Sequence, residues 1–407
     1  MDRNSTFTVT ADTMSKALPN MAMSTRAIHG DDFASSHTGI APAMHVAVNY
    51  RYARDPTKLV PGENKNPSDP NDSFVYSRYS APNGARFEKV LEGLLGGPVI
   101  TYSTGLAAFH AIMVLLNPKR VFIGDGYHGV HAVIHLMAKL TGVQKLGLDQ
   151  LGQVEPGDLI HIETPVNPTG EARNIAFFSH VARKAGAYLT VDSTFGPPPL
   201  QNPLEFGADI VLHSATKYIG GHSDMMGGVL VVRPANAIEK WWMATLYAER
   251  LVMGNSIGNL EGWLGLRSLR TLELRVTRQS QTAENLAKWI HEEINDSSSD
   301  VGRVVESIKH ASLQKNGVKE AWLNKQMPRG FAPVFAIWMK TADQARQFPS
   351  KLCIFQHATS LGDVESLIEW RAMSDTTCDP RLLRISCGLE DVNDLRKDLL
   401  QGFKALL

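Results

Sequence analysis

The feature that most constrains the fold is an alternation of short apolar runs with helical patterns between residues 75 and about 255. The runs are continuously apolar, which is typical of strands that are covered on both faces. The runs expected to form strands are 121–123, 159–162, 188–192, 210–212 and 229–232. The helices expected between them are 106–116, 130–141 and 178–185. This alternation predicts an α/β fold with a mostly parallel central sheet.

The chain has 407 residues, which is enough for more than one domain with its own core. Residues 1–28 are expected to be a poorly ordered polar tail, and 55–72, rich in Pro, Asn, Lys and Asp, an exposed loop. From residue 259 a helical pattern rich in Leu and Arg leads into a second α/β segment. The parts predicted are an N-terminal tail and arm over 1–74, a large α/β domain over 75–258 and a smaller C-terminal α/β domain over 259–407.

Composition excludes several classes of partner. The 41 basic and 41 acidic residues cancel, so neither a nucleic acid nor a membrane surface is expected as a partner. No apolar stretch approaches the length of a transmembrane helix or of a signal peptide. Cys353, Cys378 and Cys387 are few, odd in number and not in metal-binding spacing, which favours a reducing compartment and no metal site. These features predict a cytoplasmic, enzyme-sized protein.

Two polar residues stand at the ends of expected strands. Lys217 closes the loop Ser-Ala-Thr-Lys after the run 208–213, and Asp192 ends the run that begins at residue 187. A lysine that forms a Schiff base and a carboxylate that keeps a pyridine nitrogen protonated are the two groups that a pyridoxal phosphate (PLP) enzyme needs. Each has a plainer interpretation by itself, because most lysines are surface charges and an aspartate after a strand often caps a helix.

Three further motifs surround this pair. Gly105 and Leu106 open a helix whose backbone amides and dipole favour a phosphate, although a plain helix start has the same pattern. Tyr127 follows the expected strand 121–123 and could stack on a flat ring or simply fill surface. Asn167 stands between two prolines, which either aim its amide from a stiff backbone or only form a turn.

The loop that ends at Lys217 also matches the Ser-x-x-Lys of penicillin-recognising serine hydrolases. Those enzymes need a Ser-Asp-Asn or Tyr-x-Asn element and a Lys-Thr-Gly element as well. Here residues 340–342 read Lys-Thr-Ala, and Ser223-Asp224 continues with methionine. A serine hydrolase is therefore the weaker alternative, since four-residue patterns often match by chance.

Taken together, the motifs resemble those of the cystathionine γ-synthase / methionine γ-lyase group, the Cys/Met-metabolism PLP enzymes. The matching segments follow the family's order and lie at 76–78, 103–105, 125–127, 163–168, 191–195, 214–222, 360–362, 365–367 and 383–386. An ordered series of matches is far more specific than any one of them. The resemblance implies pyridoxal 5'-phosphate as cofactor and a type I, aspartate-aminotransferase-like fold. It makes 75–258 the PLP-binding domain and 1–74 an arm that contributes to the neighbouring subunit.

The resemblance also implies a role for each site residue. Lys217 would carry the cofactor and move protons, Asp192 would pair with the pyridine nitrogen, and Tyr127 would stack on the ring and assist proton transfer. The residues implied to hold the phosphate are Gly105, Leu106, Ser214, Thr216 and, from the neighbouring subunit, Tyr76 and Arg78. Those implied to bind the substrate carboxylate are Arg384, Asn167, which also touches the cofactor, and Ser360. A homodimer or homotetramer with shared active sites is expected.

Three departures from the family pattern bear on the substrate. His128 follows the stacking tyrosine where the family has glycine, and Thr359 precedes Ser360 where cystathionine-handling members usually have glutamate. The stretch 368–374 reads Ile-Glu-Trp-Arg-Ala-Met-Ser in place of a family segment with Pro and Thr-His. Without the glutamate, cysteine is expected to be a poor partner. The pattern resembles divergent fungal relatives that join O-acetylhomoserine to carbon or nitrogen nucleophiles in secondary metabolism.

The expected activity is γ-replacement on an activated homoserine, O-acetyl-L-homoserine. Lys217 would remove the Cα proton, and loss of the acyloxy group through a vinylglycine ketimine would let a carbon, sulfur or nitrogen nucleophile add at Cγ. The alternatives are a γ-lyase or a cystathionine γ-synthase of the same family, and a binding protein with the PLP fold but no catalysis. The intact lysine, aspartate and arginine argue against the last.

Overall fold

Two β-sheets organise the chain in this computed structural model, which describes residues 10–34, 39–61, 74–234, 236–315 and 321–407. The strands of the larger sheet are β1 (Val99–Tyr102), β2 (Arg120–Ile123), β3 (Gln144–Leu146), β4 (Leu159–Glu163), β5 (Tyr188–Asp192), β6 (Ile210–Ser214) and β7 (Gly228–Val232). Their order is β1-β7-β6-β5-β4-β2-β3. Strands β3, β2, β4, β5 and β6 are parallel, whereas β7 runs antiparallel to both β6 and β1. The predicted α/β fold with a mostly parallel central sheet is confirmed.

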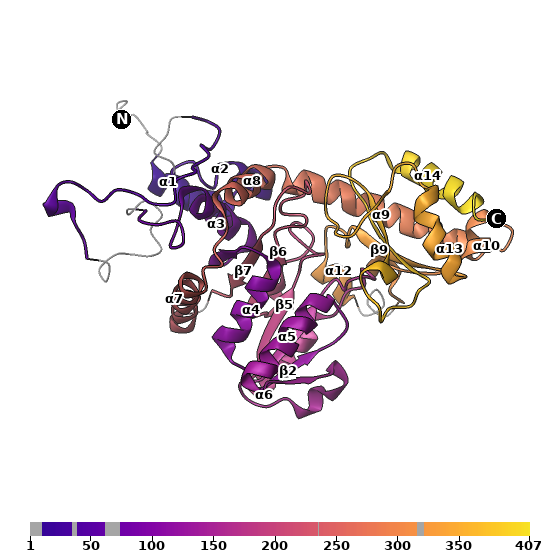
Figure 1. Cartoon of the computed structure of the whole chain (residues 1–407), viewed down its shortest axis with the longest axis horizontal. Helices are drawn as coiled ribbons and strands as arrows, with labels where there is room; N and C mark the ends of the chain where they lie inside the picture. Colours follow the sequence, from indigo (N-terminus) through magenta and orange to yellow (C-terminus); the bar gives the residue numbers. More distant parts are fainter. Residues whose placement is uncertain (1–9, 35–38, 62–73, 235, 316–320) are drawn as a thin grey trace, which may run out of the picture.

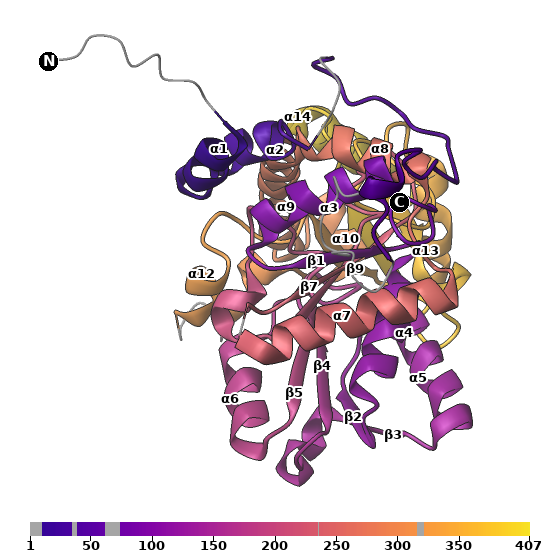
Figure 2. The same ribbon diagram turned by 90° about the vertical axis from the view of Figure 1, so that its left-hand side faces the viewer.

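Helices cover both faces of this sheet, which is why its strands are continuously apolar. The helices on one face are α4 (Gly105–Leu116), α5 (His128–Thr141) and α7 (Asn236–Met253). Those on the other are α3 (Pro82–Leu95), α6 (Ile175–Ala185) and α8 (Asn259–Leu269). Successive strand residues enter different cores: Ile210 and Leu212 pack under α4, while Val211 between them packs on the opposite side. Figure 2 shows α5 and α6 on opposite sides of the strands.

The second sheet belongs to the C-terminal part of the chain. Its strands are β8 (Val305–Lys309), β9 (Val334–Met339), β10 (Gln356–His357), β11 (Leu367–Trp370) and β12 (Leu382–Ser386), in the order β10-β11-β12-β9-β8. The helices of this part are α9 (Leu272–Ile294), α10 (Asp300–Val304), α12 (Trp322–Gln326), α13 (Ala342–Gln347) and α14 (Val392–Lys404). Figure 1 shows the long helix α9 leading from the large sheet to this smaller unit. Its own buried cluster lies between the sheet, α9 and α14.

The structure of the N-terminal segment differs from the predicted one. Residues 1–28 were expected to form a poorly ordered tail, but the described residues contain two helices, α1 (Ala11–Ala17) and α2 (Met23–His29). Met23 and Ala27 are buried in the core that contains α3. The overall polar composition hid this arrangement, because a helix of two turns needs only one apolar face to dock. Residues 1–9 lie outside the described residues.

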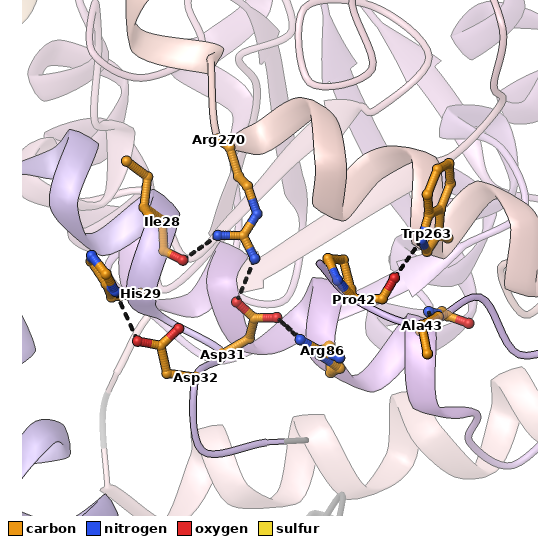
Figure 3. A network of polar contacts seen from close by, with 10 residues as sticks. Ile28, His29, Asp31, Asp32, Pro42, Ala43, Arg86, Trp263 and Arg270 are labelled. Carbon is orange, nitrogen blue, oxygen red and sulfur yellow. Dashed lines mark hydrogen bonds and ion pairs between the residues drawn. The ribbon is translucent and has the colours of Figure 1, made fainter. Parts of the chain in front are cut away.

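An ion-pair network fixes the chain that follows α2 (Figure 3). Asp31 is buried and accepts hydrogen bonds of 2.9 and 2.5 Å from Arg86 on α3. Its other oxygen pairs with Arg270 at 3.2 Å, and Arg270 also donates to the carbonyl of Ile28. Further along, the indole of Trp263 donates to the carbonyl of Pro42 at 2.9 Å. The beginning of the predicted arm is therefore anchored on α3 and α8.

Two further findings concern the predicted exposed loop and membrane-spanning helices. Residues 55–61, the described part of the predicted exposed loop, are exposed and contain a short 3-10 turn at Pro56–Lys58, while 62–72 lie outside the described residues. Among the helices of the described chain, none combines the length and the apolar character needed to cross a membrane.

Candidate active site

The site lies where the parallel strands end. Strands β2, β4, β5 and β6 point the same way, so their carboxyl ends meet at one edge of the sheet. Tyr127 follows β2, Glu163 ends β4, Asp192 ends β5, and Lys217 follows β6. Such an edge is where open α/β sheets bind their ligands.

Asp192 presents one free carboxylate oxygen at this edge. Its Oδ1 accepts hydrogen bonds from the backbone N–H and the hydroxyl of Thr194, at 2.9 and 2.6 Å, and no described group donates to its Oδ2. The hydroxyl oxygen of Thr194 in turn accepts from the backbone N–H of Ser214 at 2.9 Å. Burial raises the pKa of Asp192 to about 6, against the lowering effect of the Thr194 bonds. A cation at the free oxygen would favour the ionised form, so the site suits a protonated pyridine nitrogen.

Glu163 was not among the predicted site residues, although it begins the segment 163–168 that matches the family. It faces Asp192 across the register of β4 and β5, and only 7% of it is exposed. Its two oxygens accept the backbone N–H groups of Tyr127, at 2.7 Å, and of Asn167, at 2.6 Å. Burial and the charge of Asp192 raise the pKa of Glu163 to about 8. One carboxyl group therefore fixes the two loops that carry the predicted ring-stacking and amide residues.

Lys217 contacts the C-terminal part of the chain. Its Nζ donates to the Oγ of Ser360 at 2.5 Å. Burial, followed by the positive charge of Arg384, lowers the pKa of Lys217 to about 8. A Cβ at Gly362 would lie 3.0 Å from the carbonyl carbon of Lys217, and Gly362 has a φ of +91°, so only glycine fits there. The loop 360–362 therefore lies directly on the lysine.

The first turn of α4 presents backbone amides at the same edge. Thr104 caps the helix by accepting from the N–H of Ala107 at 3.0 Å, which leaves the N–H groups of Gly105 and Leu106 without helical partners. A Cβ at Gly105 would come within 3.2 Å of the Cβ of Ser214. A side chain at this position would be tightly packed against Ser214, and the close approach places the amides beside the Ser214 loop. Thr216 is held in that loop, where its Oγ1 accepts from the N–H of Gly227 at 3.1 Å.

Arg384 gathers the predicted carboxylate-binding residues. It lies on β12, is 4% exposed, and donates from Nη1 to Asn167 Oδ1 at 3.1 Å and from Nη2 to the Ser360 carbonyl at 2.7 Å. Burial lowers its pKa to about 10, so it stays charged at neutral pH. Asn167 comes from the part of the chain that forms the large sheet, Ser360 and Arg384 come from the C-terminal part, and the three converge beside Lys217.

The remaining predicted residues lie toward the surface. The ring of Tyr127 is 4.8 Å from that of His128, and both residues are exposed, as is Thr359. The Cζ of Arg78 lies 5.5 Å from the centre of the Tyr76 ring, and Nη1 of Arg78 donates to the carbonyl of Leu251 at 2.9 Å. Among the described residues, neither Tyr76 nor Arg78 forms a contact with Lys217 or Arg384 of the same chain. Their role in a neighbouring subunit's site stays a prediction. Over the described ranges, no group of three or more His, Cys, Asp or Glu is placed to hold a metal ion.

The geometry agrees with comparisons to known proteins. Residues 24–404 match the family model of Cys/Met metabolism PLP-dependent enzymes. Similar proteins include cystathionine gamma-synthase of Escherichia coli, 33% identical over 81% of this chain and 87% of that protein. Cystathionine gamma-lyase of Saccharomyces cerevisiae is 30% identical over 93% of this chain and 96% of its own length. The crystal structure of metB from Corynebacterium glutamicum matches with a TM-score of 0.82 and 27% identity, covering 96% of this chain and all of that one, 100%.

The chain belongs to the family of Cys/Met metabolism PLP-dependent enzymes. The family implies pyridoxal 5'-phosphate as its cofactor, and the residues fit this group. The free oxygen of Asp192, the half-buried Lys217 and the unpaired amides at the start of α4 lie at one edge of the sheet. The comparisons do not support the serine hydrolase alternative, because the chain belongs to a family of PLP-dependent enzymes.

Proposed function

We propose that the protein catalyses γ-replacement on O-acetyl-L-homoserine. The observation that carries the proposal is that Lys217 and Arg384 both contact Ser360, one at its hydroxyl and one at its carbonyl. An amino acid whose carboxylate binds Arg384 would thus have its Cα next to the lysine amine. The relatives named cystathionine gamma-synthase and cystathionine gamma-lyase support chemistry at Cγ.

In this proposal, residues at the carboxyl ends of the strands and at the start of α4 hold the cofactor. The amides of Gly105 and Leu106, with the hydroxyls of Ser214 and Thr216, would hold the phosphate. Asp192 Oδ2 would pair with the ring nitrogen. Tyr127 would cover one face of the ring, with its loop held by Glu163. When bound, pyridoxal phosphate supplies the electron sink that makes hydrogens on Cα and Cβ acidic.

The protein's own contribution is proton transfer and orientation. Nζ of Lys217 would take the proton from Cα and then, as a base of lowered pKa, act at Cβ so that acetate leaves from Cγ. Ser360 would hold the amine on the correct side through its 2.5 Å hydrogen bond. Arg384 would fix the carboxylate and Asn167 the arginine, so that the reacting bonds keep one orientation throughout.

The entrance favours an uncharged or anionic nucleophile. Thr359 is exposed and carries no charge, so it offers no partner for the ammonium group of cysteine. His128 is also exposed and adjoins Tyr127, which places an imidazole where it could accept a proton from an incoming carbon acid or thiol. A γ-lyase is the second candidate, favoured by the length over which the yeast cystathionine gamma-lyase matches this chain.

The assembly is proposed to be a homodimer or homotetramer with composite sites. Arg78 is exposed, and Tyr76 is 40% exposed, so both side chains are available to a neighbouring subunit. In that subunit they would complete the phosphate site at α4.

The test is product analysis by mass spectrometry with O-acetyl-L-homoserine and a thiol, an amine, cysteine or a β-keto acid. γ-Substituted amino acids should form, with cysteine as a poor partner. O-acetyl-L-serine, whose leaving group is on Cβ, is the control substrate. The variant Thr359→Glu should raise cysteine use about tenfold, whereas Ser350→Glu, on an exposed turn of the same domain, should not. Efficient cystathionine formation by the wild type would show that this description of the entrance is wrong.

A further inference from the structure

Arg384, the proposed carboxylate clamp, already forms an ion pair with a carboxylate of the protein. Glu369 on β11 is the direct register partner of Arg384 on β12. The Oε2 of Glu369 lies 2.5 Å from the Nη2 of Arg384, and the two side chains are 3% and 4% exposed. Nη2 also donates to the Ser360 carbonyl, and Nη1 donates to Asn167. Both terminal nitrogens of the guanidinium therefore face oxygens of the protein before any substrate arrives.

Glu369 has a second set of partners. Arg371 Nη1 donates to its Oε2 at 2.9 Å, and Ser374 Oγ donates to its Oε1 at 2.5 Å. Arg371 is 5% exposed, and its buried Nε has no partner in the described chain. Burial acts to raise the pKa of Glu369, but Arg384, Ser374 and Arg371 outweigh it and hold the pKa below its usual range. Glu369 is thus a charged group shared between two buried guanidinium groups.

We propose that Glu369 is a built-in competitor for the substrate carboxylate, which occupies Arg384 in the empty site and stays with Arg371 and Ser374 when the substrate binds. This inference rests on the proposed role of Arg384 as the carboxylate clamp. A bidentate carboxylate accepts two parallel hydrogen bonds from two neighbouring N–H donors of a guanidinium group. A substrate carboxylate that uses Nη2 of Arg384 as one of these donors competes with Glu369 Oε2, which lies 2.5 Å from that nitrogen.

The charge balance gives the exchange a physical basis. A buried guanidinium without a counter-ion is costly, so the empty site is stabilised by Glu369 on Arg384. When a substrate carboxylate takes Arg384, Arg371 keeps Glu369 paired through its 2.9 Å hydrogen bond, and Arg371 also has Asp375 Oδ2 at 3.9 Å. Substrate binding is therefore weakened, because the attraction between Glu369 and Arg384 is lost when the substrate carboxylate replaces Glu369. Glu369 therefore sets how strongly every amino-acid carboxylate binds, and removing its charge should tighten binding.

The experiment titrates the PLP-loaded enzyme with L-norvaline and follows the cofactor absorbance. L-norvaline carries a carboxylate and an amine but no leaving group, and n-butylamine is the same probe without the carboxylate. Glu369→Gln should bind L-norvaline about tenfold more tightly and leave n-butylamine unchanged. Glu369→Asp keeps the charge but withdraws it by one methylene, so it should also tighten L-norvaline binding. Glu306→Gln, which removes a carboxylate paired with Arg381 on the exposed side of the same domain, is the matched control and should behave as wild type.

The outcomes separate the inference from the proposed function. If Arg384→Ala leaves the dissociation constant of L-norvaline unchanged, Arg384 is not the clamp and the proposed function fails. If Arg384→Ala weakens binding and Glu369→Gln or Glu369→Asp also weakens it, Glu369 only orients the arginine and the inference is overturned. If either variant of Glu369 alters n-butylamine as much as L-norvaline, the effect does not involve the carboxylate and the inference is again overturned.

Discussion

The amine of Lys217 and the hydroxyl of Ser360 are joined by a 2.5 Å hydrogen bond between residues 143 positions apart in the chain. Ser360 adopts a left-handed backbone conformation with a φ of +76°, which is uncommon for a residue with a side chain. Its carbonyl accepts from Arg384, so one residue contacts both the proposed base and the proposed carboxylate clamp. The position of the C-terminal unit thereby fixes the environment of the lysine.

Ser360→Ala should lower kcat about tenfold while cofactor content stays at the wild-type level. The hydroxyl that orients the amine of Lys217 is lost, but the carbonyl bond to Arg384 is kept. Steady-state kinetics together with cofactor absorbance measures both quantities. Ser350→Ala, whose lost hydroxyl donates to the Gln347 carbonyl on an exposed turn, is the control. An unchanged kcat in Ser360→Ala would mean that the contact does not guide the amine.

Borohydride reduction of the loaded enzyme should attach the cofactor to Lys217. Its half-buried position and lowered pKa make its amine the best placed nucleophile at the strand ends. Peptide mass mapping locates the label. Lys217→Ala should lose the label and more than about a hundredfold in turnover, whereas Lys340→Ala in the smaller domain should lose neither. A label on another lysine would contradict the assignment.

Glu163→Gln should flatten the pH dependence of stability in the cofactor-free protein. The folded-state pKa of Glu163 is raised from 4.5 to about 8, so the folded state holds this proton more tightly than the unfolded state does. That contribution is present at pH below 4.5 and is lost as the pH rises toward about 8. The variant should therefore show a smaller fall in Tm between about pH 6 and pH 8, even if its Tm is lower throughout. Equal slopes in the two proteins would show that Glu163 is ionised in the folded state.

Mixing two inactive variants should restore activity if the sites are composite. Arg78→Ala removes the residue proposed to serve the neighbouring site, and Lys217→Ala removes the residue that serves its own. A hybrid of the two contains one site with both residues intact. Subunit exchange followed by an activity assay measures the recovery, and each variant mixed with itself is the control. A fully active monomer in sedimentation analysis would refute shared sites.

The sequence predicts the interior of the large sheet better than its margins. The run 188–192 is strand β5 with the same bounds, because burial on both faces leaves an unmistakable apolar run. Edge strand β3, in contrast, contains exposed Gln144 and Lys145 and carries no such signal. Helix α2 was missed for a similar reason, since only Met23 and Ala27 are buried in it.

The candidate site also has features that the sequence predicts and features that it does not. Lys217 and Asp192 could be placed together because parallel strands end at one edge, whatever the details of the loops. Their roles, and those of the other site residues, stay predictions. The pairing of Glu369 with Arg384 depends on the register of β11 against β12, and a shift of one residue would turn Glu369 to the other face. The two bonds that Glu163 accepts depend on loop conformations that no residue spacing specifies.

The most direct test of γ-replacement is a mass balance for O-acetyl-L-homoserine incubated with the enzyme and hydrosulfide. Acetate, the γ-thiol amino acid and 2-oxobutanoate are measured in the same sample. γ-Replacement predicts that the thiol product accounts for most of the acetate, with little 2-oxobutanoate. If 2-oxobutanoate instead equals acetate with hydrosulfide and with every other nucleophile tried, the enzyme is a γ-lyase and the proposed replacement is wrong.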